Sequence, residues 1–171
     1  MWKKSMLLLL GLVLLGGCSP TTDLRSDVIL TVDEPGIGTG VLYTAHGQYF
    51  ASLARESASG WKVYTDRTLF TQHTTVGVPI LWASAAYERK GELVLVWGGV
   101  TNDPEVVKVV AKGQEYDVSE NAYLFVWSGV EGEYDFTPAY ALDKEGRILY
   151  QIIGDGTGFG WSRPHTGDQE S

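Results

Sequence analysis

Three carboxylates, Glu131, Glu133 and Asp135, alternate with other residues along one short segment. In an extended strand, residues at i, i+2 and i+4 project to the same face, so this spacing would place the three side chains in a row. Such a row could bind a calcium ion, or supply the acid and base of glycoside cleavage. The same pattern is typical of a solvated hairpin whose charges prevent edge-to-edge pairing. No D-x-D-x-D-G calcium loop is present, which favours the hairpin.

Other residue types that carry catalysis or bind metals are scattered. The sequence contains neither a G-x-S-x-G nucleophile elbow nor an H-E-x-x-H zinc motif. His46, His73 and His165 are far apart and lie in turn-like or tail segments, which favours solvated or core roles over a shared site. We therefore predict no catalytic residue, no metal site and no cofactor.

Two glycine-rich segments, residues 35–40 and 154–160, have the composition of phosphate-binding loops. Such loops bind anions because they open a helix whose N-terminal amide groups point at the phosphate. Residues 161–164, which follow the second segment, contain no lysine and show no helical pattern. Both segments are therefore interpreted as surface loops.

Tryptophans are the best candidates for a binding surface. Trp82, Trp97 and Trp127 lie within apolar runs, where a tryptophan usually fills core volume. Trp61 and Trp161 lie beside glycine-rich or polar turns instead. We predict that these two side chains are exposed and bind a ligand.

The segments that must position these side chains are short strands. From Val28 onward, runs of β-branched and aromatic residues alternate with turns rich in Gly, Asp, Asn, Pro and Ser. This number and spacing of strands predicts an all-β fold, either a single antiparallel β-sandwich or a small barrel-like domain. The predicted strands are Val28–Val32, Val41–Thr44, Tyr49–Arg55, Trp61–Thr65, Ile80–Tyr87, Leu93–Trp97, Val106–Val110, Tyr123–Trp127, Ala139–Leu142 and Ile148–Ile153.

The segment from Asp103 to Val110 permits two interpretations. Asp103 and Pro104 could begin a helix as N-cap and first helical residue, and the valines that follow have helical spacing. Four valines in five residues nevertheless favour a strand, and Gly113 would end a helix after barely two turns. We therefore expect a strand.

The N-terminus has the three parts of a secretory signal. Lys3 and Lys4 precede the apolar run Met6–Leu15, whose ten residues are about half of the roughly 20 needed to cross a bilayer. The run ends in Leu15-Gly16-Gly17-Cys18, which resembles the lipobox of bacterial lipoproteins. The resemblance implies cleavage before Cys18 and attachment of fatty acyl chains such as palmitate through its thiol. Since Cys18 is the only cysteine, we expect a lipid anchor on the extracytoplasmic face of the cell membrane.

Cleavage changes the charge and sets the expected boundaries. Loss of Lys3 and Lys4 leaves 11 basic and 21 acidic side chains, a formal net charge of −10. This charge disfavours nucleic acid and close contact with anionic lipid. With no second cysteine, we expect no disulfide, thiolate metal site or cysteine nucleophile in the folded part. The expected parts are a signal peptide (1–17), a lipidated cysteine with a polar tether that holds the domain off the membrane (18–27), an all-β domain (28–161) and a flexible tail (162–171).

Several short motifs lie between Trp82 and Leu149: Trp82-Ala83-Ser84, Trp97-Gly98-Gly99-Val100-Thr101-Asn102-Asp103-Pro104, Val107-Lys108-Val109, residues 125–127 and Leu142-Asp143-Lys144-Glu145-Gly146-Arg147-Ile148-Leu149. With these motifs the stretch resembles small uncharacterised lipoproteins of spore-forming Gram-positive bacteria. The likeness covers under half of the mature chain and implies a fold and compartment, without an activity.

From the sequence we expect a non-catalytic binding domain whose partner is an envelope protein or glycan. The alternative is an envelope glycan-binding or carboxylate-based glycan-hydrolysing protein. If the protein is a binding domain, we expect an exposed apolar patch. If it is a hydrolase, we expect two carboxylates about 5–9.5 Å apart in one cleft.

Overall fold

A computed structural model describes residues 21–23, 28–64, 71–74, 77–89, 91–130, 138–152 and 160–164. All regular structure within these residues is β-strand, which confirms the predicted all-β class. The strands are β1 (Thr21–Asp23), β2 (Val28–Glu34), β3 (Gly38–Ala45), β4 (Gln48–Ser57), β5 (Gly60–Tyr64), β6 (Thr71–Thr74), β7 (Ile80–Arg89), β8 (Glu92–Thr101), β9 (Lys108–Ala111), β10 (Gln114–Asp117), β11 (Ala122–Val130), β12 (Ala139–Leu142) and β13 (Ile148–Ile152).

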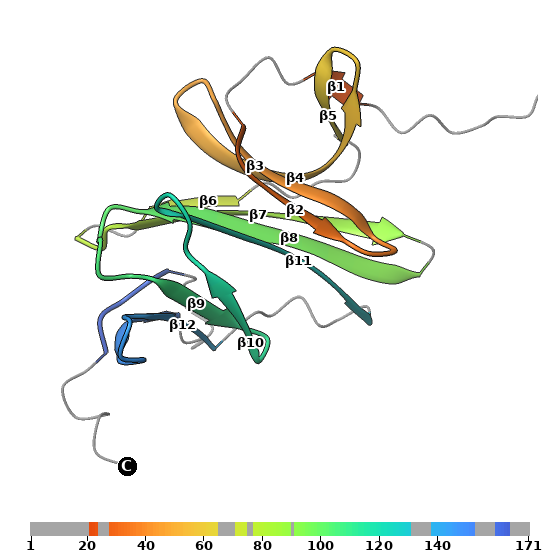
Figure 1. Cartoon of the computed structure of the whole chain (residues 1–171). Helices are drawn as coiled ribbons and strands as arrows, with labels where there is room; N and C mark the ends of the chain where they lie inside the picture. Colours follow the sequence, from red (N-terminus) through yellow and green to blue (C-terminus); the bar gives the residue numbers. More distant parts are fainter. Residues whose placement is uncertain are drawn as a thin grey trace, which may run out of the picture.

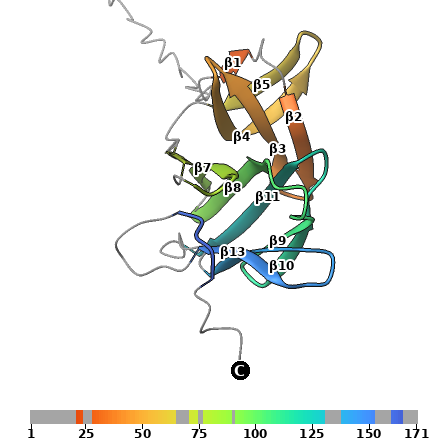
Figure 2. The same cartoon turned by 90° about the vertical axis from the view of Figure 1, so that its left-hand side faces the viewer.

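These strands form three sheets that stack as layers (Figure 1). The five-stranded sheet has the order β1-β5-β4-β3-β2, the middle sheet β11-β8-β7-β6, and the third sheet β10-β9-β12-β13. The described strand pairs are all antiparallel. Figure 2 shows the same stacking from the side. The predicted antiparallel sandwich is therefore present, with a third sheet as an additional layer.

The middle sheet is buried on both faces. On β8, Leu93, Leu95 and Trp97 face the third sheet, while Val94 and Val96 face the five-stranded sheet. Successive side chains of a strand point to opposite faces, so a continuous apolar run fits a strand that is covered twice. This pattern is the physical reason for three layers.

The space between the middle and third sheets is filled by aromatic side chains, and we call it the aromatic interface. Trp97 lies at its centre, with ring centroids 4.9 Å from Phe125, 5.3 Å from Tyr123 and 6.0 Å from Trp161. Gly99 provides the room, because a Cβ there would lie 2.6 Å from the hydroxyl of Tyr123. The other buried residues of the interface are Ile80, Trp82, Leu93, Leu95, Val106, Val109, Ala111, Ala139, Ala141, Tyr150 and Ile152.

The space between the five-stranded and middle sheets is filled by smaller side chains, and we call it the aliphatic interface. The two sheets approach closely at Gly40, where a Cβ would lie 2.5 Å from Cγ2 of Val126. Among the described residues, Tyr87 is the one aromatic residue buried here. Its hydroxyl accepts a hydrogen bond from the backbone N–H of Leu53 (3.0 Å) and shares one with the Ser52 hydroxyl (2.7 Å). The buried apolar residues of the interface are Leu42, Ala51, Leu53, Ala83, Ala85, Tyr87, Val94, Val96, Ala122, Leu124 and Val126.

The three strands that the sequence pattern did not predict are β1, β6 and β10, and each lies at the edge of its sheet. Edge strands have one unpaired side and little apolar burial, so polar sequences such as Thr-Thr-Asp and Gln-Glu-Tyr-Asp are tolerated there. Each of the ten predicted strands overlaps an observed strand. The strand interpretation of the valine-rich segment is confirmed from Lys108, whereas residues 104–107 form a turn and a link into β9.

Two expected boundary segments contain ordered pairing. Residues Thr21–Asp23, within the expected tether, pair with β5 in the register Thr21↔Tyr64 to Asp23↔Lys62. Ser162, within the expected tail, exchanges two 2.8 Å backbone hydrogen bonds with Gln151 of β13. The folded body therefore begins closer to Cys18, and ends later, than the pattern of apolar residues suggests.

Candidate functional site

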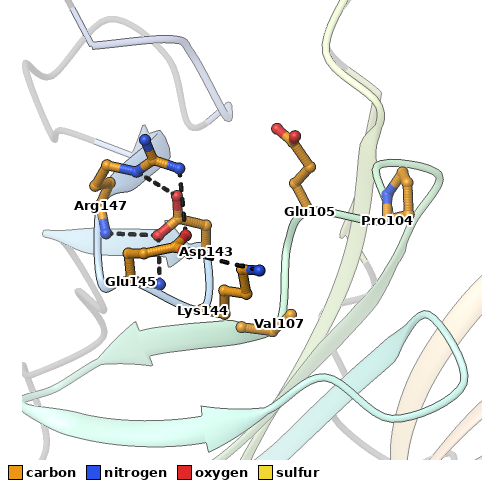
Figure 3. A pocket seen from close by; sticks show the side chains of 7 residues that line it. All are labelled: Pro104, Glu105, Val107, Asp143, Lys144, Glu145 and Arg147. Atoms are coloured by element: carbon orange, nitrogen blue, oxygen red, sulfur yellow. Dashed lines mark hydrogen bonds and ion pairs between the residues drawn. The ribbon is translucent and has the colours of Figure 1, made fainter.

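A cleft of about 450 Å³ opens at the end of the third sheet (Figure 3). One wall is the turn between β12 and β13, and the other is the link that leads into β9. The backbone N–H of Val107 donates to the carbonyl of Leu142 (2.9 Å), which holds the two walls together. The cleft is lined by Pro104, Glu105, Val107, Asp143, Lys144, Glu145 and Arg147.

Asp143 organises the turn wall. Its Oδ1 accepts hydrogen bonds from the backbone N–H groups of Glu145 (3.0 Å) and Arg147 (2.8 Å). Its Oδ2 accepts a hydrogen bond from the Nε–H group of Arg147 (2.6 Å). Desolvation alone would raise the pKa of Asp143, but the hydrogen bonds and charge of Arg147 outweigh it, so the pKa is lowered. Asp143 therefore stays ionised and serves as the acceptor that shapes the turn.

Asp103 organises the opposite wall. Its Oδ1 accepts the backbone N–H of Glu105 (3.0 Å), and its Oδ2 accepts the hydroxyl of Tyr150 (2.7 Å). The backbone N–H of Asp103 donates to Oγ1 of Thr101 (3.0 Å). Burial, followed by the hydrogen bond to Asp103, raises the pKa of Tyr150. The hydrogen bond from Tyr150, a residue of β13, therefore holds the link against the third sheet.

The lining of the cleft combines charges of both signs with an apolar surface. Arg147 Nη2 lies 3.3 Å from a carboxylate oxygen of Glu145, and Lys144 Nζ lies 3.6 Å from the other. The pKa of Arg147 is raised chiefly by its hydrogen bond to Asp143 and the charge of that residue, with smaller contributions from Glu145 and Glu105. Val107 is 38% exposed and is the one large apolar side chain in the described part of the chain that is classed as exposed. The cleft can therefore hold a polar ligand that also has an apolar part.

Asp143 is unsuited to be the acid of glycoside cleavage. A general acid requires a carboxyl group with a raised pKa, and Asp143 has a lowered one. Glu145 is paired with Arg147 and Lys144. Glu105 is the remaining carboxylate of the lining, and its side chain lies across the cleft from the turn (Figure 3).

The two tryptophans predicted to form one binding surface lie in different layers. Trp161 is fully buried in the aromatic interface, stacked on Trp97, so the prediction that it is exposed is wrong. The backbone pairing of Ser162 with Gln151 draws the preceding residue inward, which the neighbouring glycines in the sequence did not reveal. Trp61 is half-buried on the five-stranded sheet.

Trp61 belongs to an apolar cluster on the face of the five-stranded sheet that is turned away from the middle sheet, and we call this the outer cluster. Tyr43 and Phe50 stack there with ring centroids 5.4 Å apart. Burial, with a smaller contribution from Tyr87, raises the pKa of Tyr43 to about 12. Val41, Tyr43, Ala54 and Val63 are buried in the cluster, and Val28, Ala45, Phe50 and Trp61 are partly buried against it.

Several other residues singled out in the sequence lie outside the described residues: Cys18, Glu131, Glu133, Asp135, His165 and most of the glycine-rich segment 154–160. His46 is described and lies exposed in the turn between β3 and β4, with φ of 52°. A Ser-x-x-Lys spacing, which serine acyl enzymes use, occurs at Ser59–Lys62. Ser59 lies in the turn before β5, and Lys62 lies within β5. Residues three apart in extended chain do not share a face, so this spacing does not direct the two side chains to one site.

The cleft residues themselves were not predicted as a site. Both walls carry an Asp-x-Glu sequence in which the aspartate accepts the N–H two residues later, a pattern that marks a turn wherever it occurs. Each turn could be predicted separately. Their proximity depends on the pairing of β9 with β12, whose paired residues are 28 to 34 positions apart in the sequence.

Among the described residues there is no group of three His, Cys, Asp or Glu side chains that could hold a metal ion. The same part of the chain contains no helix of sufficient length and hydropathy to cross a membrane. Comparisons with models of known protein families, with curated proteins and with solved structures found no match.

Proposed function

We propose that this protein is a bacterial lipoprotein held by lipid on Cys18 at the extracytoplasmic face of the cell membrane, where it acts as a non-catalytic binding domain. The observation that carries the proposal is the sequence Leu15-Gly16-Gly17-Cys18 at the end of an apolar run of signal-peptide length. The one cysteine of the chain stands where lipid attachment needs a thiol.

The anchor is tested by replacing its thiol. Cys18→Ser should abolish incorporation of labelled palmitate and release the protein from the membrane fraction, because the thioether can no longer form. Ser19→Ala is the matched control, since it leaves the thiol in place and should label as the wild type does. Label uptake by Cys18→Ser at the wild-type level would contradict the proposal.

The binding role is supported by the cleft of Figure 3, whose volume lies in the range of small-ligand sites, about 300–1,000 Å³. Its walls are held by hydrogen bonds to Asp103 and Asp143, and they present charges of both signs beside Val107. A peptide or glycan of the cell envelope has the mixed polar and apolar character that such a lining recognises.

Binding is tested with purified peptidoglycan sacculi and with envelope proteins cross-linked to the intact lipoprotein. A Glu105→Gln, Arg147→Ala variant should lose about tenfold in affinity, the loss of about 1.4 kcal/mol that one good polar contact supplies. Glu115→Gln, which alters an exposed ion pair elsewhere on the third sheet, is the control and should bind normally. Retention of full affinity by the double variant would exclude the cleft.

The same samples separate binding from hydrolysis. A binding domain leaves the glycan strands intact over long incubation. Release of soluble fragments by the wild type, and its loss in Glu105→Gln alone, would instead establish the carboxylate-based hydrolase.

A further inference from the structure

The distance between the anchor and the folded body is set by strand β1. Ser19 and Pro20 alone separate Cys18 from Thr21, the first residue of β1. A fully extended chain spans at most about 3.6 Å per residue, so the Cα atoms of Cys18 and Thr21 lie within about 11 Å whatever path these residues take. If Cys18 carries the membrane lipid, β1 lies at the membrane surface.

The position of β1 among the three layers determines which side of the molecule lies nearest the membrane. β1 pairs with β5 at one edge of the five-stranded sheet. In both views, β1 and β5 lie on the opposite side of the middle sheet from β9 and β10 (Figures 1 and 2). Stacked sheets are about 10 Å apart, so the third sheet lies about 20 Å beyond the five-stranded sheet.

We propose that the outer cluster of the five-stranded sheet lies against the lipid headgroups of the anchoring membrane, so that the third sheet and its cleft point away from the bilayer. This inference rests on the proposed lipid anchor. It assigns the outer cluster a lipid surface as its partner, and it shortens the expected tether of residues 18–27 to the two residues Ser19 and Pro20.

The chemistry of the outer cluster suits an interface between water and lipid. Trp61 and Phe50 are half-buried there around an apolar floor that includes Val41 and Val63. Tryptophan and tyrosine concentrate at the headgroup level of membranes because their rings are apolar and their tips polar. By contrast, the cleft on the third sheet is lined mostly by charged side chains.

The acidic charge of the mature chain does not oppose this orientation. Strands β1 to β5 contain four acidic residues and two basic ones, a net charge of −2 within the −10 of the mature chain. Interactions between exposed charges are screened beyond about 8–10 Å at physiological ionic strength. Charges on the third sheet are about twice that distance away and contribute little repulsion.

The orientation can be measured with single fluorophores on the intact lipoprotein in phosphatidylcholine vesicles. Because the thiol of Cys18 is consumed by lipid, Ser59→Cys and Lys144→Cys each add one reactive thiol, in the β4–β5 turn and at the cleft respectively. Energy transfer to a rhodamine-labelled headgroup should be about twofold greater from position 59, given a difference of about 20 Å. Equal transfer, or greater transfer from position 144, would overturn the proposal.

A lengthened link provides the matched control. Inserting about 20 Gly and Ser residues between Pro20 and Thr21 gives the link a root-mean-square length of about 25 Å and should abolish the difference between the two positions. Transfer between labelled copies at position 59, without transfer to the headgroup, would show that a second copy covers the outer cluster and would overturn the lipid assignment. Failure of the anchor itself is distinguishable, because the unmodified protein would not be recovered with the vesicles.

Contact at the outer cluster is tested by quenching of tryptophan fluorescence with brominated phosphatidylcholine. The Trp61→Ala variant should lose the quenched fraction, whereas Trp127→Ala should keep it. Trp127 is a suitable control because it is also half-buried, but it lies on the side of the middle sheet that faces the third sheet. Unchanged quenching in Trp61→Ala would place the outer cluster away from lipid.

Discussion

The aliphatic interface and the aromatic interface are built from alternate residues of the same strands, yet they pack differently. On β11, Leu124 and Val126 belong to the aliphatic interface, and Tyr123 and Phe125 to the aromatic one. On the first side Gly40 packs directly against Val126, and on the second side large rings such as Trp97 and Phe125 fill the space between the sheets. Each face of the middle sheet is therefore matched to its own partner, so the outer sheets are not interchangeable.

Trp161→Ala should have the largest effect, because it removes a fully buried ring from the aromatic interface. We expect a loss of about 3–5 kcal/mol in the free energy of unfolding, measured by urea denaturation, the usual range for a buried tryptophan. Trp61→Ala, at a half-buried position, should cost clearly less. A loss below about 1 kcal/mol for Trp161→Ala would show that the aromatic interface is not a close-packed core.

Gly40→Ala should have an intermediate effect at the aliphatic interface, since the added Cβ would lie 2.5 Å from Cγ2 of Val126. Overpacking of this kind costs about 1–3 kcal/mol, although alanine is ordinarily better than glycine within a strand. In a Val126→Ala background the cost should shrink by at least about 0.5 kcal/mol, as a double-mutant cycle would detect. Strictly additive losses would indicate that the two sheets are further apart than described.

Asp143→Asn should have the smallest effect, and it extends the comparison to the surface of the third sheet. Hydrogen bonds and the charge of Arg147 outweigh desolvation and lower the pKa of Asp143, so ionised Asp143 stabilises the fold above the ordinary aspartate pKa of 3.8. This contribution is lost as the pH falls through the lowered pKa.

The variant should therefore have a lower Tm than the wild type at neutral pH, and the difference should disappear in acid. Circular dichroism melts over a pH series measure both quantities. The exposed ion pair of Lys108 and Glu115 gives the control, because Glu115→Gln should change the Tm less. A Tm difference that persists unchanged into strong acid would contradict the role of Asp143.

The strands could be predicted because β-branched and aromatic runs between turns are a local property of the chain. The edge strands β1 and β10 could not be predicted, because their sequences are polar and lack apolar runs of β-branched and aromatic residues. They pair only when a neighbouring strand is in place. The turns at Asp103 and Asp143 could also be recognised locally. Their assembly into one cleft could not be recognised, because it depends on pairing between residues 28 to 34 positions apart.

The all-β class and the antiparallel strands follow from local sequence, since alternation and turn residues act over a few neighbouring positions. Three features depend instead on long-range packing: a third sheet covers the middle one, Trp161 is buried, and β1 closes the edge beside β5. The physical reason is that burial depends on what packs above a residue, and the covering strand can lie anywhere in the chain. The continuous apolar run of β8 required two covering layers, and long-range pairing supplied them.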